Sequence, residues 1–417
     1  MLININSQKT KEDKSSSSPF ADARVIEEVL TRGVEKIYPS KLALKKLLGS
    51  KKIKLYQGFD PSMPNLHLGN LVGILKLKQF QELGHKVIFL VGDFTGMIGD
   101  PTDKISVRKK LSREQVLKNA ANWRKQIERF LDFSGKNPAK IMFNSRWNDK
   151  INFKDLIEIT SNFTVQKMLE RDFFQERIKT GKPIFLHEFL YPVAQAIDCV
   201  QMDVDLEIGG SDQTFNMLVG RDLMRTLKDK EKFVLTTKLL IDKEGRKVGK
   251  TTGGAIFLNI PPNEMFGAIM TFPDEVISLG FELLTTVSLP LIKKYERLLK
   301  EKRINPNELK KILALEITKL NYGERAAKGA LEEFEKVFKK KQLPSQIPTI
   351  KIPEEKMKIL EFLVKVKLAP SKSEAKRLIL QKAVKIDGQL KEDWREILKI
   401  KKGIVIRVGK RRFAKII

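Results

Sequence analysis

The spacing of apolar positions changes along the chain and divides it into regions. Between about residues 50 and 260, short apolar runs alternate with longer stretches in which apolar residues recur every three or four positions. The runs predict strands, and residues 68–84 predict a helix that ends at Gly84. This alternation predicts an α/β fold with helices on both faces of a doubly wound parallel sheet. The expected strands are 52–58, 86–93, 141–147, 204–207 and 233–242.

The last third of the chain has a different pattern. Residues 262–341 are expected to be mostly helical, because apolar side chains recur at helical spacing between acidic and basic ones. Three prolines in 342–353 disfavour helix and central strand, which predicts a linker. Beyond it, the pattern predicts a helix capped by Ser371 or Ser373, a hairpin turning at Asp387–Gly388, and a pair of basic strands.

Composition excludes several classes of protein. Of the 417 residues, 41% are hydrophobic, which is enough for buried cores, and no apolar run approaches the roughly 18 residues that span a bilayer. A single cysteine, Cys199, excludes a disulfide framework and a cysteine-rich zinc site. Residues 1–20 lack the apolar core of a secretory signal and are expected to form a flexible tail, in keeping with a reducing, cytoplasmic setting.

The charge balance is strongly basic. Lys and Arg number 79 against 51 Asp and Glu, which gives +28 and fits a polyanionic partner such as nucleic acid. AT-rich coding sequence or growth at high temperature would also enrich lysine, so the distribution of charge matters more. Residues 352–417 hold 19 basic and 8 acidic residues, a net of +11, and this segment is therefore a basic module.

Residues 56–73 are a candidate phosphate site. A predicted strand leads through a proline-containing turn into a helix that begins near His67. Nucleotides bind in doubly wound sheets where a strand ends beside a helix N-terminus, because that terminus offers unpaired N–H groups to phosphate. His67 and Asn70 share one face and can both donate to phosphate oxygens, and Gly69 allows close approach to the backbone. Neither a P-loop nor a dinucleotide-binding glycine pattern is present.

Five motifs in series carry a resemblance to a known family. PNLHLGN resembles the HIGH motif of class I aminoacyl-tRNA synthetases, and VGDFTGMIGDPTDK, YPVAQAID, IGGSDQTFN and KVGKT follow in the order of the bacterial tyrosyl-tRNA synthetases. Asn70 stands where most relatives have a second histidine, and KVGKT lacks the usual Met and ends in Thr. The resemblance covers roughly residues 30–417. It implies a tail (1–20), a Rossmann-like catalytic domain (21–261) with a dimer-forming insertion at about 110–185, a helical anticodon-region domain (262–341), the linker (342–353) and an S4-like RNA-binding domain (354–417).

The resemblance also implies an ATP site. Lys247 and Lys250, three apart in a glycine-containing loop, would place two cations on the phosphates, and Asp212 suits the ribose hydroxyls. A solvated loop and a helix N-cap are the plainer explanations of these residues. The implied catalytic residues are His67, Asn70, Lys247, Lys250 and Thr251. The implied ATP ligands are Asp60, Ser62, His67, Gly69, Asn70, Lys104, Arg108, Gly210, Asp212, Lys247 and Lys250.

A tyrosine pocket follows from the same resemblance. Tyr191 and Gln195, four apart on one helix face, would join Asp100 around the ammonium group, and Asp198 would meet the phenol together with Tyr56. A carboxylate and a phenol aimed at one hydroxyl suit tyrosine, since phenylalanine would leave both unpaired. The implied tyrosine ligands are Tyr56, Thr95, Asp100, Tyr191, Gln195, Asp198 and Gln213.

The implied activity is that of a tyrosine–tRNA ligase. Tyrosine and ATP form tyrosyl-adenylate and pyrophosphate, and the tyrosyl group then passes to the terminal ribose of tRNA(Tyr), releasing AMP. Mg²⁺ is expected to accompany ATP without a dedicated protein metal site. A homodimer with no membrane association is expected, with Lys372, Lys376 and Arg377 exposed on the S4-like helix to contact RNA backbone.

Two alternatives remain open. One is the sister enzyme that activates tryptophan, against which the pairing of Tyr56 with Asp198 and the S4-like tail argue. The other is a non-catalytic RNA-binding protein with a decayed synthetase body, for which Asn70 is the one favourable feature.

Overall fold

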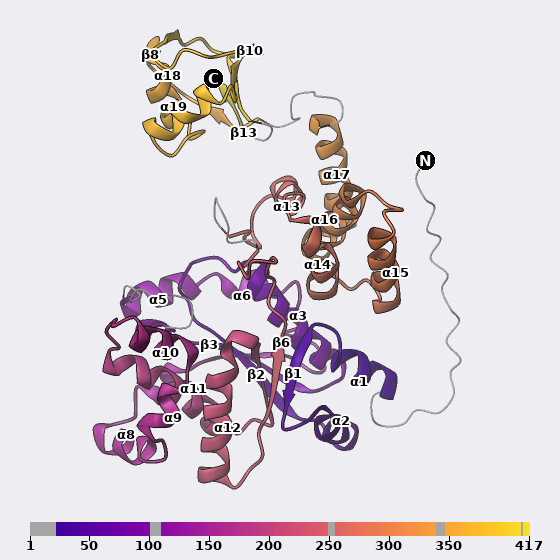
Figure 1. Ribbon diagram of the computed structural model, residues 1–417, viewed down its shortest axis with the longest axis vertical. Helices are drawn as coiled ribbons and strands as arrows, with labels where there is room; N and C mark the ends of the chain where they lie inside the picture. Colours follow the sequence, from indigo (N-terminus) through magenta and orange to yellow (C-terminus); the bar gives the residue numbers. More distant parts are fainter. Residues whose placement is uncertain (1–21, 101–109, 249–254, 339–346, 410–411) are drawn as a thin grey trace. The chain divides into compact units, whose positions relative to one another are not determined.

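The computed structural model describes residues 22–100, 110–248, 255–338, 347–409 and 412–417 (Figure 1). Its contacts divide the chain into two units: Met1–Ile260 with Phe272–Leu309, and Pro261–Thr271 with Lys310–Ile417. Of the segment predicted to be mostly helical, 262–341, the described residues 262–338 are mostly helical, and their helices are shared between the two units.

The first unit is built on a six-stranded sheet in the order β1-β6-β5-β2-β3-β4. Neighbouring strands are parallel except β1, which pairs antiparallel with β6 at one edge. The chain moves outward from β2 to β3 and β4 and returns to β5 on the other side, so the strand order reverses between β2 and β5. The strands are β1 (Val34–Tyr38), β2 (Lys54–Phe59), β3 (Lys86–Val91), β4 (Lys140–Phe143), β5 (Leu206–Gly210) and β6 (Phe233–Thr237).

Helices cover both faces of this sheet, which confirms the doubly wound arrangement. Helices α11 (Leu186–Met202) and α12 (Thr214–Lys228) pack on the face that carries Tyr56. Helix α3 (Leu68–Glu82) covers the face that carries Gln57, so closely that a Cβ on Gly73 would lie 2.1 Å from Gln57 Oε1.

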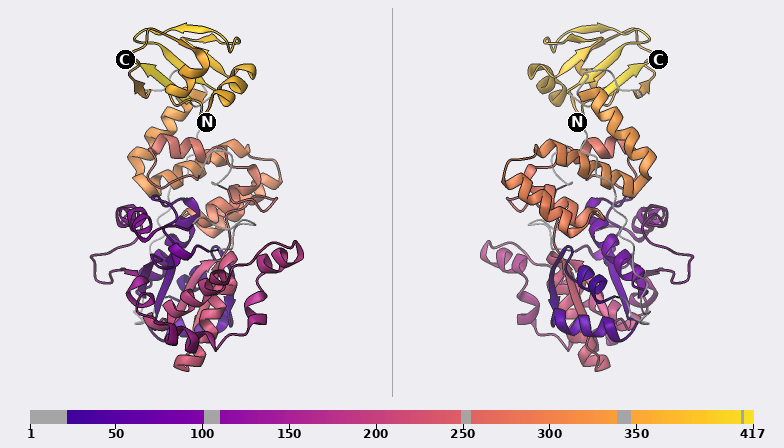
Figure 2. Two further views of the ribbon diagram at one scale, coloured as in Figure 1. Left: turned by 90° about the vertical axis from the view of Figure 1, so that its left-hand side faces the viewer. Right: turned by 90° about the vertical axis from the view of Figure 1, so that its right-hand side faces the viewer.

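The remaining helices of the first unit are short. Helices α8 to α10 lie at its periphery (Figures 1 and 2). The helices are α1 (Ala23–Val29), α2 (Lys41–Ser50), α4 (Thr95–Ile98), α5 (Arg113–Ala120), α6 (Trp123–Ile127), α7 (Ser145–Asn148), α8 (Phe153–Thr160), α9 (Val165–Leu169), α10 (Asp172–Lys179), η2 (Ser211–Gln213), η3 (Asp274–Val276), α14 (Ile277–Leu284) and α15 (Leu289–Lys300).

The predicted boundaries hold where local signals decide them. Helix α3 gives way at Gly84 to a left-handed residue with φ +80°, as predicted. The predicted strand 141–147 is wrong beyond Phe143, because Asn144 turns the chain into α7 while its side chain bonds to buried polar groups. The predicted strand 233–242 ends at Thr237, where Lys238 turns to pair with Glu282.

The second unit contains helices and a small α+β domain. Its helices are α13 (Pro262–Ile269), most of α16 (Pro306–Tyr322) and α17 (Glu324–Phe338). The α+β domain has a sheet in the order β10-β9-β12-β13-β7 and a ribbon of β11 and β8. Its elements are β7 (Thr349–Ile350), β8 (Lys356–Lys358), α18 (Ile359–Lys365), α19 (Lys372–Leu380), β9 (Val384–Ile386), β10 (Gln389–Leu390), β11 (Ile397–Lys399), β12 (Val405–Val408) and β13 (Arg412–Ile416).

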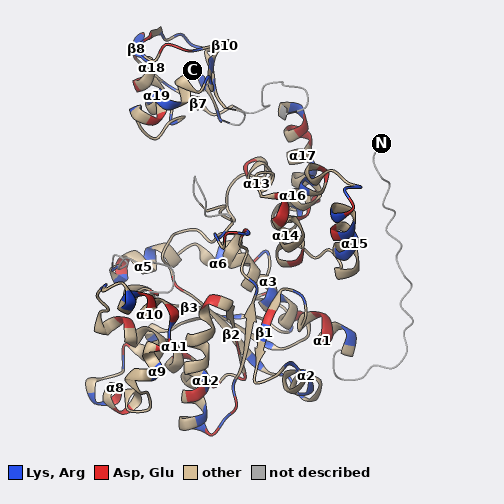
Figure 3. Cartoon of the chain, viewed as in Figure 1, with Lys and Arg blue, Asp and Glu red and all other residues tan. Residues whose placement is uncertain are grey.

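This domain confirms three predictions. Ser371 caps α19 by accepting from the backbone N–H of Glu374. Asp387 and Gly388 have φ of +50° and +82°, as the hairpin between β9 and β10 requires. Strands β12 and β13 form the predicted antiparallel pair. Basic side chains occur over its strands and helices, as they do on α2 and α15 (Figure 3).

Candidate active site

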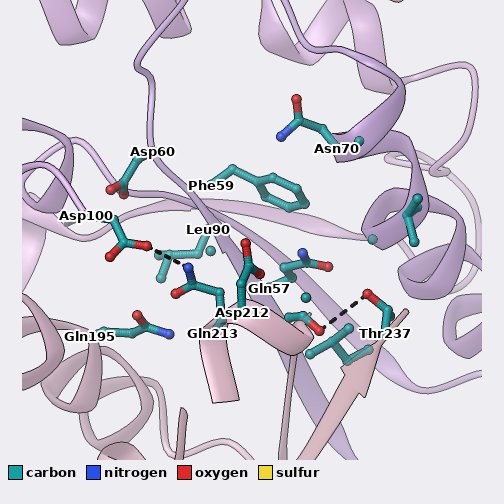
Figure 4. Close-up of a pocket in the computed structure, with 18 of the residues that line it drawn as sticks. Gln57, Phe59, Asp60, Asn70, Leu90, Asp100, Gln195, Asp212, Gln213 and Thr237 are labelled. Carbon is teal, nitrogen blue, oxygen red and sulfur yellow. Dashed lines mark hydrogen bonds between the residues drawn. The ribbon is translucent and has the colours of Figure 1, made fainter. Parts of the chain in front are cut away.

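A cavity opens at the carboxyl ends of the parallel strands, where the strand order reverses between β2 and β5 (Figure 4). Every tyrosine- or ATP-site residue predicted within the described part of the chain lines it. They are Tyr56, Asp60, Ser62, His67, Gly69, Asn70, Thr95, Asp100, Tyr191, Gln195, Asp198, Gly210, Asp212, Gln213 and Lys247. Lys104, Arg108, Lys250 and Thr251 lie outside the described residues.

The first turn of α3 forms one wall. His67 Nδ1 accepts from the backbone N–H of Asn70 at 3.3 Å, and Asn70 Oδ1 accepts from the backbone N–H of His67 at 3.0 Å. This reciprocal cap fixes both side chains. The Asn70 oxygen is used in the cap, so its amino group is the atom turned toward the cavity (Figure 4). Gly69 makes room for the imidazole, since a Cβ there would lie 2.9 Å from His67 Cε1.

The turn after β5 forms the wall across from α3. Asp212 Oδ2 accepts from Lys247 Nζ at 2.9 Å, and both side chains are partly exposed. A Cβ on Gly210 would lie 2.5 Å from Asp212 Oδ1, so a side chain here would displace the Asp212 carboxylate. We refer to His67, Asn70, Gly210, Asp212 and Lys247 as the phosphate end of the cavity.

The opposite end is more deeply buried. Asp198 on α11 is 2% exposed and accepts from Trp147 Nε1 at 2.7 Å, and from Asn144 Nδ2 and Asn148 Nδ2 at 3.1 Å each. Burial raises the pKa of Asp198 to about 8, although the three donors act in the opposite direction. Asn144 also donates to Thr95 Oγ1 at 3.0 Å, and this bond links the end of β4 to the start of α4.

Tyr56 is fully buried on β2 at this end. Burial, and secondarily the Glu207 carboxylate, raises the pKa of Tyr56 well above its usual value, so the side chain stays a neutral phenol. Glu207 is close enough to exert this effect, yet the hydroxyl makes no hydrogen bond of normal geometry with a described residue. A buried hydroxyl without a partner is costly, and a ligand hydroxyl would satisfy it.

Two aspartates are fixed by neighbours at the same end. Asp60 accepts from the Tyr191 hydroxyl at 2.8 Å and from Thr95 Oγ1 at 2.7 Å. Asp100 accepts from Gln213 Nε2 at 2.6 Å, and its other oxygen lies 3.3 Å from Arg171 Nη2 (Figure 4). We refer to Tyr56, Thr95, Asp100, Tyr191, Gln195, Asp198 and Gln213, together with Asp60, as the tyrosine end.

Three residues that sequence reasoning missed help to build this end. Asn144 stands directly after an apolar strand, and a polar residue at the carboxyl end of a parallel strand is a signal for a site residue. Glu207 is a charged residue inside a predicted buried strand, and it accepts from Gln195 Nε2 at 2.9 Å. Arg171 is buried against Asp100, and nothing in its local pattern marks it.

The three predicted RNA-binding residues all lie on α19. Lys372 donates to Glu361 at 2.7 Å and Arg377 to Glu374 at 2.7 Å. The Lys376 ammonium lies 4.1 Å from the centre of the Trp394 ring. The structure therefore brings them together on one element, with each in contact with a neighbour of its own domain.

The described residues contain no group of three His, Cys, Asp or Glu side chains arranged to hold a metal ion. Across the same ranges, none of the helices combines the length and apolarity needed to cross a membrane.

Comparison with known proteins identifies the family. Residues 49–339 match the family model for tRNA synthetases class I (W and Y), and residues 339–416 match that for the tyrosine–tRNA ligase SYY-like C-terminal domain. The tyrosine–tRNA ligase of Thermotoga maritima is 42% identical over 389 residues, which cover 93% of this chain and 96% of the relative. That of Aquifex aeolicus is 40% identical over 403 residues, covering 96% and 99%.

Solved structures show the same fold. The C-terminally truncated mitochondrial tyrosyl-tRNA synthetase of Aspergillus nidulans superposes with a TM-score of 0.63 at 22% identity, covering 75% of this chain and 94% of that one. The Archaeoglobus fulgidus enzyme complexed with L-tyrosine gives 0.57 at 20% identity, covering 74% and 100%. The C-terminal family model and the full-length relatives are all named for tyrosine–tRNA ligase, so the comparisons do not support the tryptophan alternative. The chain belongs to the tyrosine–tRNA ligases, class I aminoacyl-tRNA synthetases with a SYY-like C-terminal domain.

Proposed function

We propose that the cavity binds tyrosine and ATP end to end and carries out tyrosine activation. The tyrosine carboxylate attacks the α-phosphorus of ATP, the bond to the bridging oxygen breaks, and pyrophosphate leaves. The terminal ribose hydroxyl of tRNA(Tyr) then attacks the adenylate carbonyl and AMP leaves. No covalent bond to the protein is required, so catalysis rests on positioning and on stabilising charge on the phosphates.

The arrangement of acceptors at the tyrosine end carries this proposal. The Tyr191 hydroxyl donates to Asp60 and keeps its lone pairs for a ligand, and the Asp100 carboxylate can only accept. Gln195 donates through Nε2 to Glu207, which leaves Oε1 as its remaining polar atom. Three acceptors on the cavity wall match the three N–H bonds of an ammonium group. Tyr56 and Asp198 are proposed to meet the phenol.

The phosphate end is proposed to bind ATP. The Asn70 amino group and His67 would donate to phosphate oxygens, Asp212 with Gly210 would bind the ribose, and Lys247 would exchange Asp212 for a phosphate. Ser62 and Gly69 are exposed along this wall. Asp60 was expected among the ATP ligands, but its bonds to Tyr191 and Thr95 support a place at the tyrosine end. The roles of Lys104, Arg108, Lys250 and Thr251 rest on the sequence resemblance.

Mg²⁺ is proposed to enter with ATP, held by phosphate oxygens rather than by a cluster of protein carboxylates. Its chemistry there is neutralisation of phosphate charge. Because the matching full-length relatives are bacterial, we propose that the activity is cytoplasmic.

A second copy of the chain is the proposed partner of helices α8 to α10 and the start of α11. Helix α8 buries none of its residues within the chain although its apolar residues gather on one side. Exposed large apolar residues recur across this region, namely Phe153, Ile157, Val165, Ile178, Phe185 and Leu186. Several exposed apolar side chains in one region are typical of a protein interface. The chain should sediment as a dimer, and Phe153→Asp with Ile157→Lys should yield a monomer.

Exchange of labelled pyrophosphate into ATP tests the activation step. Exchange should depend on tyrosine and occur with neither phenylalanine nor tryptophan, without tRNA. Absence of exchange with all three would refute the proposed roles of this cavity. Charging of tRNA(Tyr), and its loss when the α19 variant Lys372→Glu/Lys376→Glu/Arg377→Glu is used, tests the RNA step.

A further inference from the structure

A buried ion pair lies beneath the tyrosine end, and the roles proposed above do not use it. Glu207 lies on β5 and is 2% exposed, and Lys232, directly before β6, is fully buried. Lys232 Nζ donates to Glu207 Oε2 and to the Met217 carbonyl oxygen, the latter at 3.0 Å.

The surroundings of this pair are shaped to hold it. A Cβ on Gly220 of α12 would lie 2.9 Å from Lys232 Nζ, so the helix backbone leaves room for the ammonium group. Burying two charges costs more desolvation energy than an apolar pair of similar size would. Stability of the fold alone is therefore a weak explanation of the pair, and Glu207 interacts with two residues that line the cavity, Tyr56 and Gln195.

That role is visible at the second oxygen of Glu207. Its Oε1 accepts from Gln195 Nε2 at 2.9 Å. A carboxylate has no proton to donate, so the Gln195 amide must face Glu207 with its amino group, whichever way the amide is drawn. Within the described residues no donor reaches Gln195 Oε1, and Gln195 lines the cavity close to Gln213 and Asp100 (Figure 4).

We propose that the Glu207–Lys232 pair is a positioning element for tyrosine binding, which fixes the Gln195 amide so that its oxygen faces the substrate ammonium. The proposal rests on the assignment of Gln195 to the ammonium site. Lys232 supplies the counter-charge that a buried carboxylate requires. Glu207 determines which end of the Gln195 amide faces it and which end faces the cavity. The Tyr191 hydroxyl donates to Asp60 and so keeps its lone pairs for the substrate, which means that two carboxylates of the cavity lining, Asp60 and Glu207, orient two of the three ammonium ligands.

Glu207→Gln tests the proposal because glutamine can donate as well as accept. The amino group of the new side chain at position 207 can donate to Gln195 Oε1. The Gln195 amide then turns over, and its own amino group faces the substrate ammonium and repels it. KM for tyrosine in pyrophosphate exchange should rise roughly 10- to 100-fold. KM for ATP and kcat at saturating tyrosine should stay close to wild type.

A second variant separates positioning from folding. Glu207→Gln leaves Lys232 as a buried cation without its counter-charge, so Tm should fall. The double variant Glu207→Gln/Lys232→Met removes that cation and should recover Tm, yet keep the raised KM for tyrosine. Glu231→Gln is the matched control, since Glu231 is adjacent to Lys232 but pairs with Arg221 and Arg225 at the surface. It should leave KM for tyrosine unchanged.

Two partial substrates show which group of tyrosine loses binding in Glu207→Gln. Tyramine has the ammonium group without the carboxylate, and p-hydroxyphenylpropionate has the carboxylate without the ammonium. As competitive inhibitors, tyramine should weaken by the same factor as tyrosine in Glu207→Gln, and p-hydroxyphenylpropionate should not weaken. Equal weakening of both, or an unchanged KM for tyrosine, would overturn the positioning role. Wild-type protein without tyrosine-dependent exchange would instead contradict the proposed function itself.

Discussion

The two ends of the cavity are built differently. At the tyrosine end the polar side chains are buried or nearly so, and Asp60, Asp100, Asp198 and Gln195 are each held by a bond to another element. At the phosphate end the side chains are partly exposed, and the bonds described for them include a local helix cap and the ion pair between Asp212 and Lys247.

This difference matches two different tasks. Distinguishing tyrosine from phenylalanine needs buried polar groups that are left unpaired by the wrong ligand, and such groups must be fixed in place. Stabilising charge on phosphates needs donors and cations that can reach the ligand as the charge develops. Variants at the tyrosine end should therefore alter tyrosine binding, and variants at the phosphate end should alter the rate.

The largest effect is expected from Asp100→Asn. It removes the charge that faces Arg171 and the ammonium site, and breaking a buried pair costs about 3–5 kcal/mol. Because the substrate ammonium would also lose its charged partner, kcat/KM for tyrosine in pyrophosphate exchange should fall by at least about a hundredfold. Glu231→Gln, which breaks a surface pair, is the control. An unchanged tyrosine KM in Asp100→Asn would mean that this carboxylate does not bind the ammonium.

Lys247→Ala should separate the two ends most clearly. Loss of one preorganised cation should lower kcat for exchange by about 10²- to 10³-fold, and the affinity for tyrosine alone should be unchanged. Single-turnover formation of tyrosyl-adenylate and calorimetric binding of tyrosine measure the two quantities. A variant that loses tyrosine affinity instead would contradict the division into two ends.

Tyr56→Phe should relax selection of the phenol. The variant loses the hydroxyl that faces the substrate, so tyrosine loses about 1 kcal/mol of binding and phenylalanine gains a less polar pocket. The ratio of kcat/KM for tyrosine to that for phenylalanine should fall about tenfold or more. If the ratio is unchanged, Asp198 alone selects the hydroxyl.

Asn70→His should change the rate only a few-fold, because the Asn70 amino group already supplies the donor. The new histidine should add a titration near the ordinary histidine pKa of about 6.5 to the pH profile of the wild type. The pH profile of kcat for both proteins is the measurement. An inactive wild type that Asn70→His activates would favour a decayed enzyme.

The last effect concerns stability instead of activity. The pKa of Asp198, about 8, lies above its ordinary value, so the folded chain holds a proton that the unfolded chain releases from about pH 4 upward. Ionising Asp198 therefore costs stability as pH rises through this window. Asp198→Asn does not titrate, so its Tm relative to wild type should increase between pH 5 and pH 8. A constant difference would show that Asp198 is ionised throughout.

The sequence predicted the residues that line the cavity better than the buried residues that hold them in place. Tyr56 lies within a predicted strand, and His67 and Asp212 stand at a helix start and in the turn after a strand; local pattern and family motifs coincide there, and the structure brings the three together. Glu207, Lys232 and Arg171 come from distant segments, and their partners are set by packing of β5, β6 and α10 rather than by spacing along the chain. The same holds for the strand predicted at 141–147, which ends early because Asn144 bonds to Asp198 and Thr95.

Binding of tyrosine without ATP or tRNA tests the central claim most directly. If the tyrosine end is formed in advance, calorimetry should show tyrosine bound at one site per chain, phenylalanine unbound, and Lys247→Ala equal to wild type. Tyrosine that binds only when ATP is present, or phenylalanine that binds as tightly as tyrosine, would contradict the account.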